Sequence, residues 1–259
     1  MTAIPSGTGP RPLTGSRRTG RAALAGAVCA ALAAALAGCA GEDPDAGTNG
    51  VGKLPAATIE AKARAAAEQA GTVRLSGKVV SQDRTYQLDM RLAKDGARGE
   101  LTTRDSAFQL LRIDTALYLK ADAGFWAGEK SEKATPPGGT AAAKLGGKYV
   151  KVPATDPVYK RFSGFTDKKM LLASLLGPHG TPATGDRGTL DGVRTIRLTG
   201  GAGGNSLDVS LEGEPYPLRL RRAGGAGEVR LGDWGKPVDL QPPAQDQIVD
   251  YGKQIAGSG

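Results

Sequence analysis

Few side chains in this sequence can carry covalent or acid–base chemistry. It contains one histidine, His179, and two cysteines, Cys29 and Cys39. A lone histidine without a second histidine or an available thiol cannot build a zinc site or a Cys–His pair. His179 stands in Gly177-Pro178-His179-Gly180 after an expected helix end, which is typical of a solvated loop. We therefore expect no metal site.

Motifs for other reactions are also missing. The sequence has no Gly-x-Ser-x-Gly elbow, no phosphate-binding loop and no His-Glu-x-x-His. Asp105, Asp114 and Asp122 stand at expected strand ends without a recognisable catalytic partner. The glycine clusters lack the spacing of a dinucleotide loop and indicate hairpin turns. We therefore expect that the protein is not an enzyme and uses no cofactor.

Cys39 has the clearest chemistry because of what precedes it. An N-terminal segment with four arginines and no acid leads into an apolar run, Ala22 to Ala37, which is shorter than the roughly 20 apolar residues that span a bilayer. Leu36-Ala37-Gly38-Cys39 closes the run and matches the bacterial lipobox, where a signal peptidase cuts before a cysteine that becomes acylated. We expect residues 1–38 to be a signal peptide and Cys39 to be a lipid anchor. A secreted protein cut near Ala40 and an uncleaved anchor are the alternatives.

The expected signal peptide contributes part of the net positive charge of the full sequence. Four of the 34 basic residues and none of the 26 acidic residues precede Cys39, so its removal lowers the net charge from +8 to +4. Nucleic-acid binding thereby loses its main compositional support. Cys29 is removed with the leader and acylation consumes Cys39, so we expect no disulfide. Stability must come from a hydrophobic core, which a chain of this size can form.

We expect a tether and then a single folded domain. Residues 39–53 are rich in Gly, Asp, Thr and Asn and cannot order themselves by burying apolar surface, so the domain is expected to span residues 54–259. A helix is predicted from Pro55 to Gly71, with proline at its start and glycine past its end. A second, leucine-rich helix is predicted to be capped by Thr166 or Asp167, to run to Leu176 and to be stopped by Gly177-Pro178.

Most of the remaining sequence alternates with period two, which predicts strands. The expected strands are residues 73–79, 86–92, 97–103, 108–113, 117–120, 148–152, 193–198, 207–211, 216–220 and 228–231. A sheet of this many strands twists and curls, and two short helices supply little volume to cover its apolar face. The sheet either closes into a filled barrel or stays a half-barrel with apolar space beneath the helices. The second form would leave a lipid-sized cavity.

Several short motifs occur in an order that resembles the LppX/LprG-type lipoproteins of actinobacteria. They are Leu117-Tyr118-Leu119-Lys120, Phe125-Trp126, Gly147 to Val152, Leu190 to Thr195, Pro215 to Arg219 and Gly232 to Val238. The resemblance implies a LolA/LolB-like α+β fold, a curved antiparallel half-barrel of about 9–11 strands whose concave face is covered by helices. It also implies binding of acylated lipids or glycolipids and their transport within the cell envelope.

These expectations define candidate sites and partners. The residues predicted to line the cavity share the inward-facing apolar positions of the strands and helices: Ile59, Val73, Leu75, Leu88, Met90, Leu117, Leu119, Leu171, Leu172, Leu175, Ile196, Leu198, Leu207, Val209 and Leu218. A second set, Arg194, Arg197, Arg219, Arg221 and Arg230, is predicted on the solvent face, either as ordinary surface residues or as a strip facing anionic headgroups.

Two functions remain open at the sequence level. The first is a monomeric lipid or acylated-glycolipid carrier, held through its lipid anchor on the extracytoplasmic face of the cell membrane and binding no nucleic acid. The second is a non-enzymatic interaction or scaffold lipoprotein of the envelope with a filled core. A sizeable apolar cavity would favour the carrier.

Overall fold

The computed structural model describes residues 43–81, 84–128, 139–177, 180–200 and 204–250. The chain divides into two units, Met1–Ala46 and Gly47–Gly259. In the first, the amide of Ala46 donates a hydrogen bond of 2.8 Å to the carbonyl of Asp43. The second holds every described strand and helix and both hydrophobic clusters of the core, so its core is complete within the unit. The predicted signal peptide and Cys39 lie outside the described residues.

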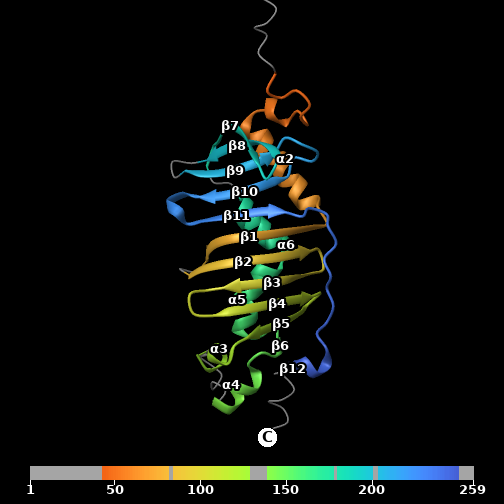
Figure 1. The fold of residues 1–259 in the computed structure, drawn as a ribbon, viewed down its shortest axis with the longest axis vertical. Helices are drawn as coiled ribbons and strands as arrows, with labels where there is room; N and C mark the ends of the chain where they lie inside the picture. Colours follow the sequence, from red (N-terminus) through yellow and green to blue (C-terminus); the bar gives the residue numbers. More distant parts are fainter. Residues whose placement is uncertain (1–42, 82–83, 129–138, 178–179, 201–203, 251–259) are drawn as a thin grey trace, which may run out of the picture. The chain divides into compact units, whose positions relative to one another are not determined.

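One open sheet dominates the second unit (Figure 1). Its twelve described strands are β1 (Thr72–Ser81), β2 (Arg84–Ala93), β3 (Gly96–Thr102), β4 (Ala107–Ile113), β5 (Ala116–Ala121), β6 (Tyr149–Val152), β7 (Pro182–Leu190), β8 (Val193–Gly200), β9 (Asn205–Ser210), β10 (Pro217–Arg222), β11 (Gly227–Gly232) and β12 (Ile248–Asp250). Their order is β12-β6-β5-β4-β3-β2-β1-β11-β10-β9-β8-β7. All neighbours are antiparallel except β12 and β6, which are parallel.

Alternation of apolar and polar residues sets the two faces of this sheet. Leu75 of β1 pairs with Met90 of β2, and both side chains are fully buried on the inner face. Arg74, opposite Arg91, and Asp89, opposite Ser76, point to the outer face, where they form a bidentate ion pair diagonally across the two strands. A one-residue slip would exchange these faces, so the pattern fixes the register.

Capping residues at the helix ends, as well as the residues within the helices, explain where the helices form. The described helices are η2 (Val51–Lys53), α2 (Ala56–Gln69), α3 (Ala123–Gly128), α4 (Gly139–Leu145), α5 (Pro157–Thr166), α6 (Lys168–Leu176), η3 (Ala223–Gly225) and η4 (Gln245–Gln247). Asp156 caps α5 through the amide of Val158, and Asp167 caps α6 through the amide of Met170, at 2.7 and 2.8 Å. The two helices predicted from the sequence, α2 and α6, are both present.

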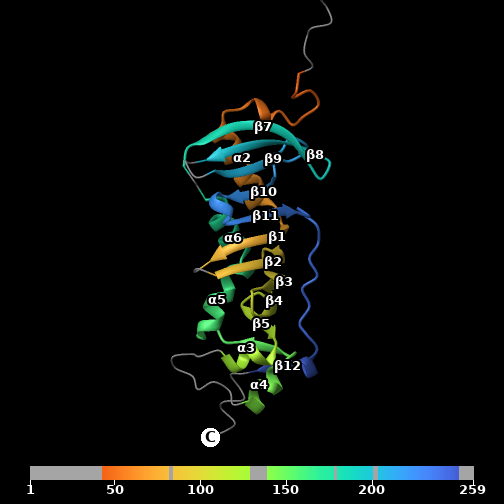
Figure 2. The ribbon, with the colours of Figure 1, turned by 60° about the vertical axis from the view of Figure 1, so that its left-hand side comes forward.

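Helices α5 and α6 pack on one face of the central strands, as Figures 1 and 2 show. Beneath α5 the space is filled by aromatic rings: Phe108 of β4 lies between Phe125 of α3 and Phe162 of α5, with centroids 4.8 and 5.1 Å away. Tyr86 of β2 contacts Phe165 of α5 at 5.1 Å. The predicted fold class, an open and mostly antiparallel sheet with helices on its inner face, is confirmed.

Some elements differ from the sequence prediction. Strand β7 was not predicted because it is an edge strand with mostly exposed residues and no alternation. Helix α5 was not predicted because Gly164 and Val158 weaken its helical propensity, while burial of Phe162 and Phe165 stabilises it. The segment from Gly232 to β12 passes the ends of the central strands and adds β12 by pairing with β6 (Figure 2).

The ordered domain also begins earlier than Leu54. The side-chain amide of Asn49 donates to the carbonyls of Ser210 and Gly213, at 3.2 and 3.0 Å. Val51 is buried and belongs to the same hydrophobic cluster as Ile59. The stretch expected as a tether, residues 39–53, therefore ends in residues that pack on the sheet.

Candidate functional site

The hydrophobic core of the second unit is divided into two clusters. The larger lies between the central strands, α5 and α6, and the smaller packs the first half of α2 against β8 and β9. Leu207 of β9 packs against both clusters. We call this boundary between the two clusters the seam. Apolar side chains from different elements meet there without interdigitating fully.

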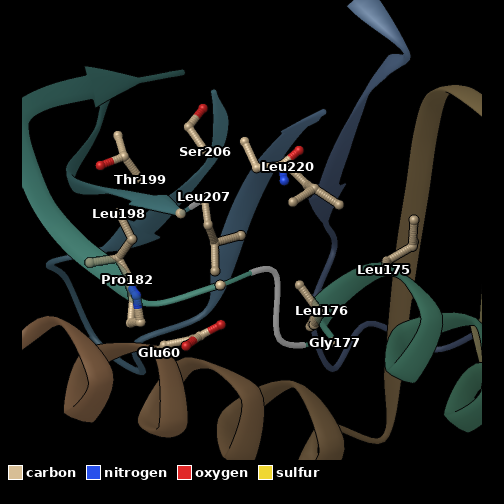
Figure 3. A pocket seen from close by; sticks show the side chains of 13 residues that line it. Glu60, Leu175, Leu176, Gly177, Pro182, Leu198, Thr199, Ser206, Leu207 and Leu220 are labelled. Atoms are coloured by element: carbon tan, nitrogen blue, oxygen red, sulfur yellow. The ribbon is translucent and has the colours of Figure 1, made fainter. Parts of the chain in front are cut away.

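A pocket occupies the seam (Figure 3). Its volume is about 40 Å³. Its wall is mainly apolar and comes from the end of α6 (Leu175, Leu176, Gly177), from Gly180 and Pro182, from β8 (Leu198, Thr199, Gly200), from β9 (Asn205, Ser206, Leu207), from Leu220 of β10 and from Glu60 of α2. Such a volume holds a few water molecules, each of which needs roughly 10–15 Å³.

The first turn of α6 is held by polar contacts from Lys168 and Arg112. The ammonium of Lys168 donates to the carbonyls of Glu68 and Ala70 at the end of α2. Just before α6, Arg112 of β4 donates 3.0 Å to the carbonyl of Thr166. At the other end, an exposed hydrogen bond of 3.0 Å from Arg222 reaches the carbonyl of Ser174. The last turn also buries Leu175 and Leu176 in the larger hydrophobic cluster.

Burial gives Lys168 an unusual electrostatic state. Its side chain is only 9% exposed. Desolvation lowers the pKa of the Lys168 ammonium below its usual value, and the carboxylate of Glu68 offsets part of this effect. The hydrogen bonds to the α2 carbonyls compensate for the water that the ammonium loses.

Glu60 is the polar residue on the helix side of the pocket (Figure 3). Glu60 lies at its wall and pairs with Arg64, one turn further along α2, at 3.4 Å. The Nε of Arg64 is buried and has no hydrogen-bond partner among the described residues. The hydroxyls of Thr199 and Ser206 point away from Leu198, Leu207 and the pocket (Figure 3), and the side-chain oxygen of Asn205 accepts a hydrogen bond from the amide of Ala223. The pocket thus has an apolar wall with the carboxylate of Glu60 at one side.

The predicted cavity residues fall into three groups. Leu175, Leu198 and Leu207 line the pocket. Ile59, Ile196 and Val209 are buried beside it in the smaller cluster. The others except Leu218 are buried in the larger cluster: Val73, Leu75, Leu88, Met90, Leu117, Leu119, Leu171 and Leu172. Whether any of these side chains contacts a ligand stays a prediction.

Leu218 is placed differently from the prediction. The pairing of β10 with β9 shifts register between Pro217 and Arg219, which breaks the alternation at this position. As a result, Leu218 lines an outer-face groove together with Arg74 and Arg230 instead of the inner pocket. A β-bulge of this kind leaves no clear signal in a single sequence.

The sequence prediction missed several pocket residues. Leu220 could have been found, because it continues the inward alternation of β10 beyond the bulge. Leu176 follows Leu172 at helical spacing on α6. Glu60 could not have been found, since its approach to Leu198 and Thr199 depends on how α2 crosses the sheet.

The described residues were also compared with two other kinds of site, a metal centre and a membrane-spanning helix. Within them, no three His, Cys, Asp or Glu side chains are grouped closely enough to hold a metal ion. His179, like Cys39, lies outside the described ranges. None of the helices in the described part of the chain is long and apolar enough to cross a membrane.

The fold matches those of solved structures, although no family model and no curated protein sequence matches the chain. LprF from Mycobacterium bovis superposes with a TM-score of 0.50 at 17% identity, covering 73% of this chain and 97% of LprF. The lipoprotein LppX from Mycobacterium tuberculosis gives 0.42 at 14% identity, covering 71% and 99%. An uncharacterised protein from Thermus thermophilus gives 0.37 at 10% identity, covering 76% and 99%. The chain therefore has the LprF fold, and the resemblance predicted from the sequence is confirmed at the level of the fold.

Proposed function

We propose that this protein is a lipid-anchored carrier that holds an acyl chain of a lipid or acylated glycolipid between α6 and strands β8–β10. The observation that carries the proposal is the apolar pocket at the seam between the two core clusters. The pocket has a hydrophobic wall with the carboxylate of Glu60 at its helix side (Figure 3), which suits a ligand with an apolar tail and a hydrogen-bonding head. The function is binding and transport, without catalysis.

The structure corresponds, in this proposal, to the closed and unloaded form. Ligand pockets have volumes of about 300–1,000 Å³, far above the approximately 40 Å³ observed here. Loading requires the last turn of α6 to move away from β9 and β10. This movement would break the exposed Arg222–Ser174 hydrogen bond and take Leu175 and Leu176 out of the hydrophobic cluster, while Lys168 keeps the first turn of α6 in place.

The anchor gives the pocket its source of lipid. A cysteine acylated at position 39 would hold the domain at the extracytoplasmic surface of the cell membrane. A single acyl chain binds membranes only marginally, and stable anchoring takes two hydrophobic or electrostatic contributions. Bacterial lipobox cysteines carry several acyl chains, so this anchor would be sufficient.

The small volume of the pocket favours a second function. An interior filled by Phe108, Phe125 and Phe162 and a pocket of about 40 Å³ also suit a scaffold lipoprotein that binds proteins and never opens. The two functions differ in one property, which is whether lipid can enter the seam.

Native mass spectrometry distinguishes them, with residues 47–259 incubated with lipids extracted from bacterial membranes and then repurified. The carrier should show a mass increase that organic extraction removes and identifies as lipid. If the protein carries no extractable lipid and binds no fluorescent fatty acid, the carrier function is excluded and the scaffold function is favoured.

A further inference from the structure

Glu60 determines what kind of polar group can enter the pocket beside an acyl chain. Its carboxylate lies on the helix side of the pocket (Figure 3), and its side chain is only 23% exposed. The hydroxyls of Thr199 and Ser206 face away, and the side-chain oxygen of Asn205 is already bonded to the amide of Ala223. The head of a bound lipid therefore meets a carboxylate that is largely withdrawn from water.

This carboxylate forms an incomplete pair with Arg64. Its Oε1 accepts a hydrogen bond of 3.4 Å from the Nη2 of Arg64, one turn further along α2. Its Oε2 has no hydrogen bond with any described residue. The buried Nε–H of Arg64 also lacks an acceptor within the described part of the chain, which is unfavourable for a donor withdrawn from water. The pair thus keeps one acceptor and one donor unused.

The pocket offers an anionic head no cation of its own. The described residues that line the pocket include no lysine and no arginine. Arg222 of β10 reaches the end of α6, but its guanidinium donates a hydrogen bond of 3.0 Å to the carbonyl of Ser174. An ionised phosphate or carboxylate would therefore lie beside the carboxylate of Glu60, and like charges at such a distance repel each other.

The arginines predicted as a headgroup-facing strip do not change this balance. Arg197 and Arg219 both bind the buried carboxylate of Asp208 on the outer face, at 2.9 and 2.6 Å. The other three also pair with acids, since Arg194, Arg221 and Arg230 contact Glu212, Glu228 and Asp191 respectively. None of the five lines the pocket.

We propose that Glu60 selects the head of the carried lipid: the pocket takes an acyl chain attached to an uncharged, hydroxyl-bearing head, such as an acylglycerol or an acylated sugar, and rejects a phosphate head. A hydroxyl both donates and accepts, so it suits the unused Oε2 of Glu60 and the guanidinium of Arg64 together. An ammonium head gains less, because this carboxylate is already paired with Arg64. The inference rests on the carrier function proposed above and adds the class of head to it.

Two ligands that differ only in one phosphate test this selection. Dodecanoylglycerol and the corresponding lysophosphatidic acid, both below their micelle concentrations, displace a fluorescent acylglycerol from residues 47–259 at pH 8, where a histidine is neutral. Dodecanoylglycerol should act at a concentration at least about tenfold lower, because Glu60 repels the phosphate. An ionised fatty acid should bind through its tail, more weakly than the acylglycerol.

Variants of the pair separate charge from packing. Glu60→Gln keeps the size of the side chain and its ability to form hydrogen bonds, and should narrow the ratio of the two ligands to about threefold or less. Arg64→Gln leaves the carboxylate without its cation and should widen the ratio at least about threefold. Glu214→Gln removes a carboxylate from the exposed β9–β10 turn and should leave the ratio unchanged. Thermal unfolding should confirm that all three variants are folded.

The outcomes distinguish this inference from the carrier function. Equal displacement by the two ligands, a preference for lysophosphatidic acid, as would arise if Arg222 bound the phosphate, or a ratio unaffected by Glu60→Gln would overturn the selection and leave the carrier function standing. Failure of both ligands, of the fluorescent acylglycerol and of a fluorescent fatty acid to bind would overturn the carrier function and the selection together.

Discussion

The ammonium of Lys168 donates a hydrogen bond to the carbonyl of Ala70, which joins the first residue of α6 to the end of α2. The two residues are 98 positions apart in the sequence. This contact holds one end of α6, and the pocket lies at the other end of the same helix. The Lys168 contact therefore lies at the end of α6 that stays in place in the carrier proposal. The pocket lies at the other end, which must move if lipid is to enter.

The first prediction concerns the pH dependence of this contact. Because burial lowers the pKa of Lys168, the unfolded chain binds more protons than the folded chain between that lowered pKa and the usual lysine value of about 10.4. The free energy of unfolding should therefore rise with pH in this window. Lys168→Met should remove this contribution and cost about 1–3 kcal/mol at neutral pH, because the two carbonyls lose their donor. Urea unfolding at several pH values measures both effects.

The exposed neighbour Lys169 provides the control for this experiment. Lys169→Met should change neither the stability nor its dependence on pH. If Lys168→Met and wild type keep the same slope of stability against pH, the ammonium of Lys168 is not desolvated in solution.

The second prediction concerns Asp208, which lies between Arg197 and Arg219 on the outer face. Its side chain is 2% exposed, so its removal leaves two arginines around a buried site without their carboxylate. Asp208→Ala should lower the free energy of unfolding by about 3–5 kcal/mol. Asp191→Asn removes the charge of the exposed pair with Arg230, keeps a residue type that tolerates the positive φ at this position, and should cost at most about 1 kcal/mol. Similar losses in the two variants, measured by urea unfolding, would contradict this assignment.

The third prediction tests the anchor. In cells that process lipoproteins, the Cys39→Ser variant of the full chain should leave the acylated membrane fraction and lose metabolic labelling with a fatty acid. Its domain should still bind lipid, because residues 47–259 contain the pocket. Labelling that persists in Cys39→Ser would show that the lipobox reading of Leu36 to Cys39 is wrong.

The fourth prediction tests the pocket by obstruction. Leu207→Trp places a larger side chain at the seam and should weaken binding of a fluorescent fatty acid at least about tenfold, or roughly 1.4 kcal/mol. Leu218→Trp introduces the same side chain at a half-buried position on the outer face and should leave the affinity unchanged. Overpacking costs about 1–3 kcal/mol in such substitutions, so thermal unfolding should confirm that both variants are folded. Equal affinities would place the binding site elsewhere.

Local patterns in the sequence were sufficient to predict the elements that have one buried face and one exposed face. Leu75 and Met90 fixed the faces of β1 and β2, and Asp167 marked the start of α6. Elements that depend on distant partners were not visible. Strand β12 exists because Ile248 pairs with Tyr149, and α5 because the strands bury Phe162.

The same difference between local patterns and distant contacts explains which residues of the pocket were predicted. Leu198 and Leu207 were predicted correctly as inward-facing residues because β8 and β9 alternate regularly. Leu218 was misplaced by a register shift in β10, and Glu60 reaches the pocket only through the crossing of α2 over the sheet. The volume of the pocket could not be predicted, since it depends on how fully the two core clusters interdigitate.

Photocrosslinking with a diazirine-bearing fatty acid tests most directly whether an acyl chain enters the seam. Residues 47–259 are irradiated with the probe, and the labelled peptides are identified by mass spectrometry. The carrier proposal predicts light-dependent labels on the end of α6 around Leu175 and on β8 and β9 around Leu198 and Leu207, suppressed by excess unlabelled lipid. Labels confined to the outer-face groove around Leu218, or none above the dark control, would contradict it.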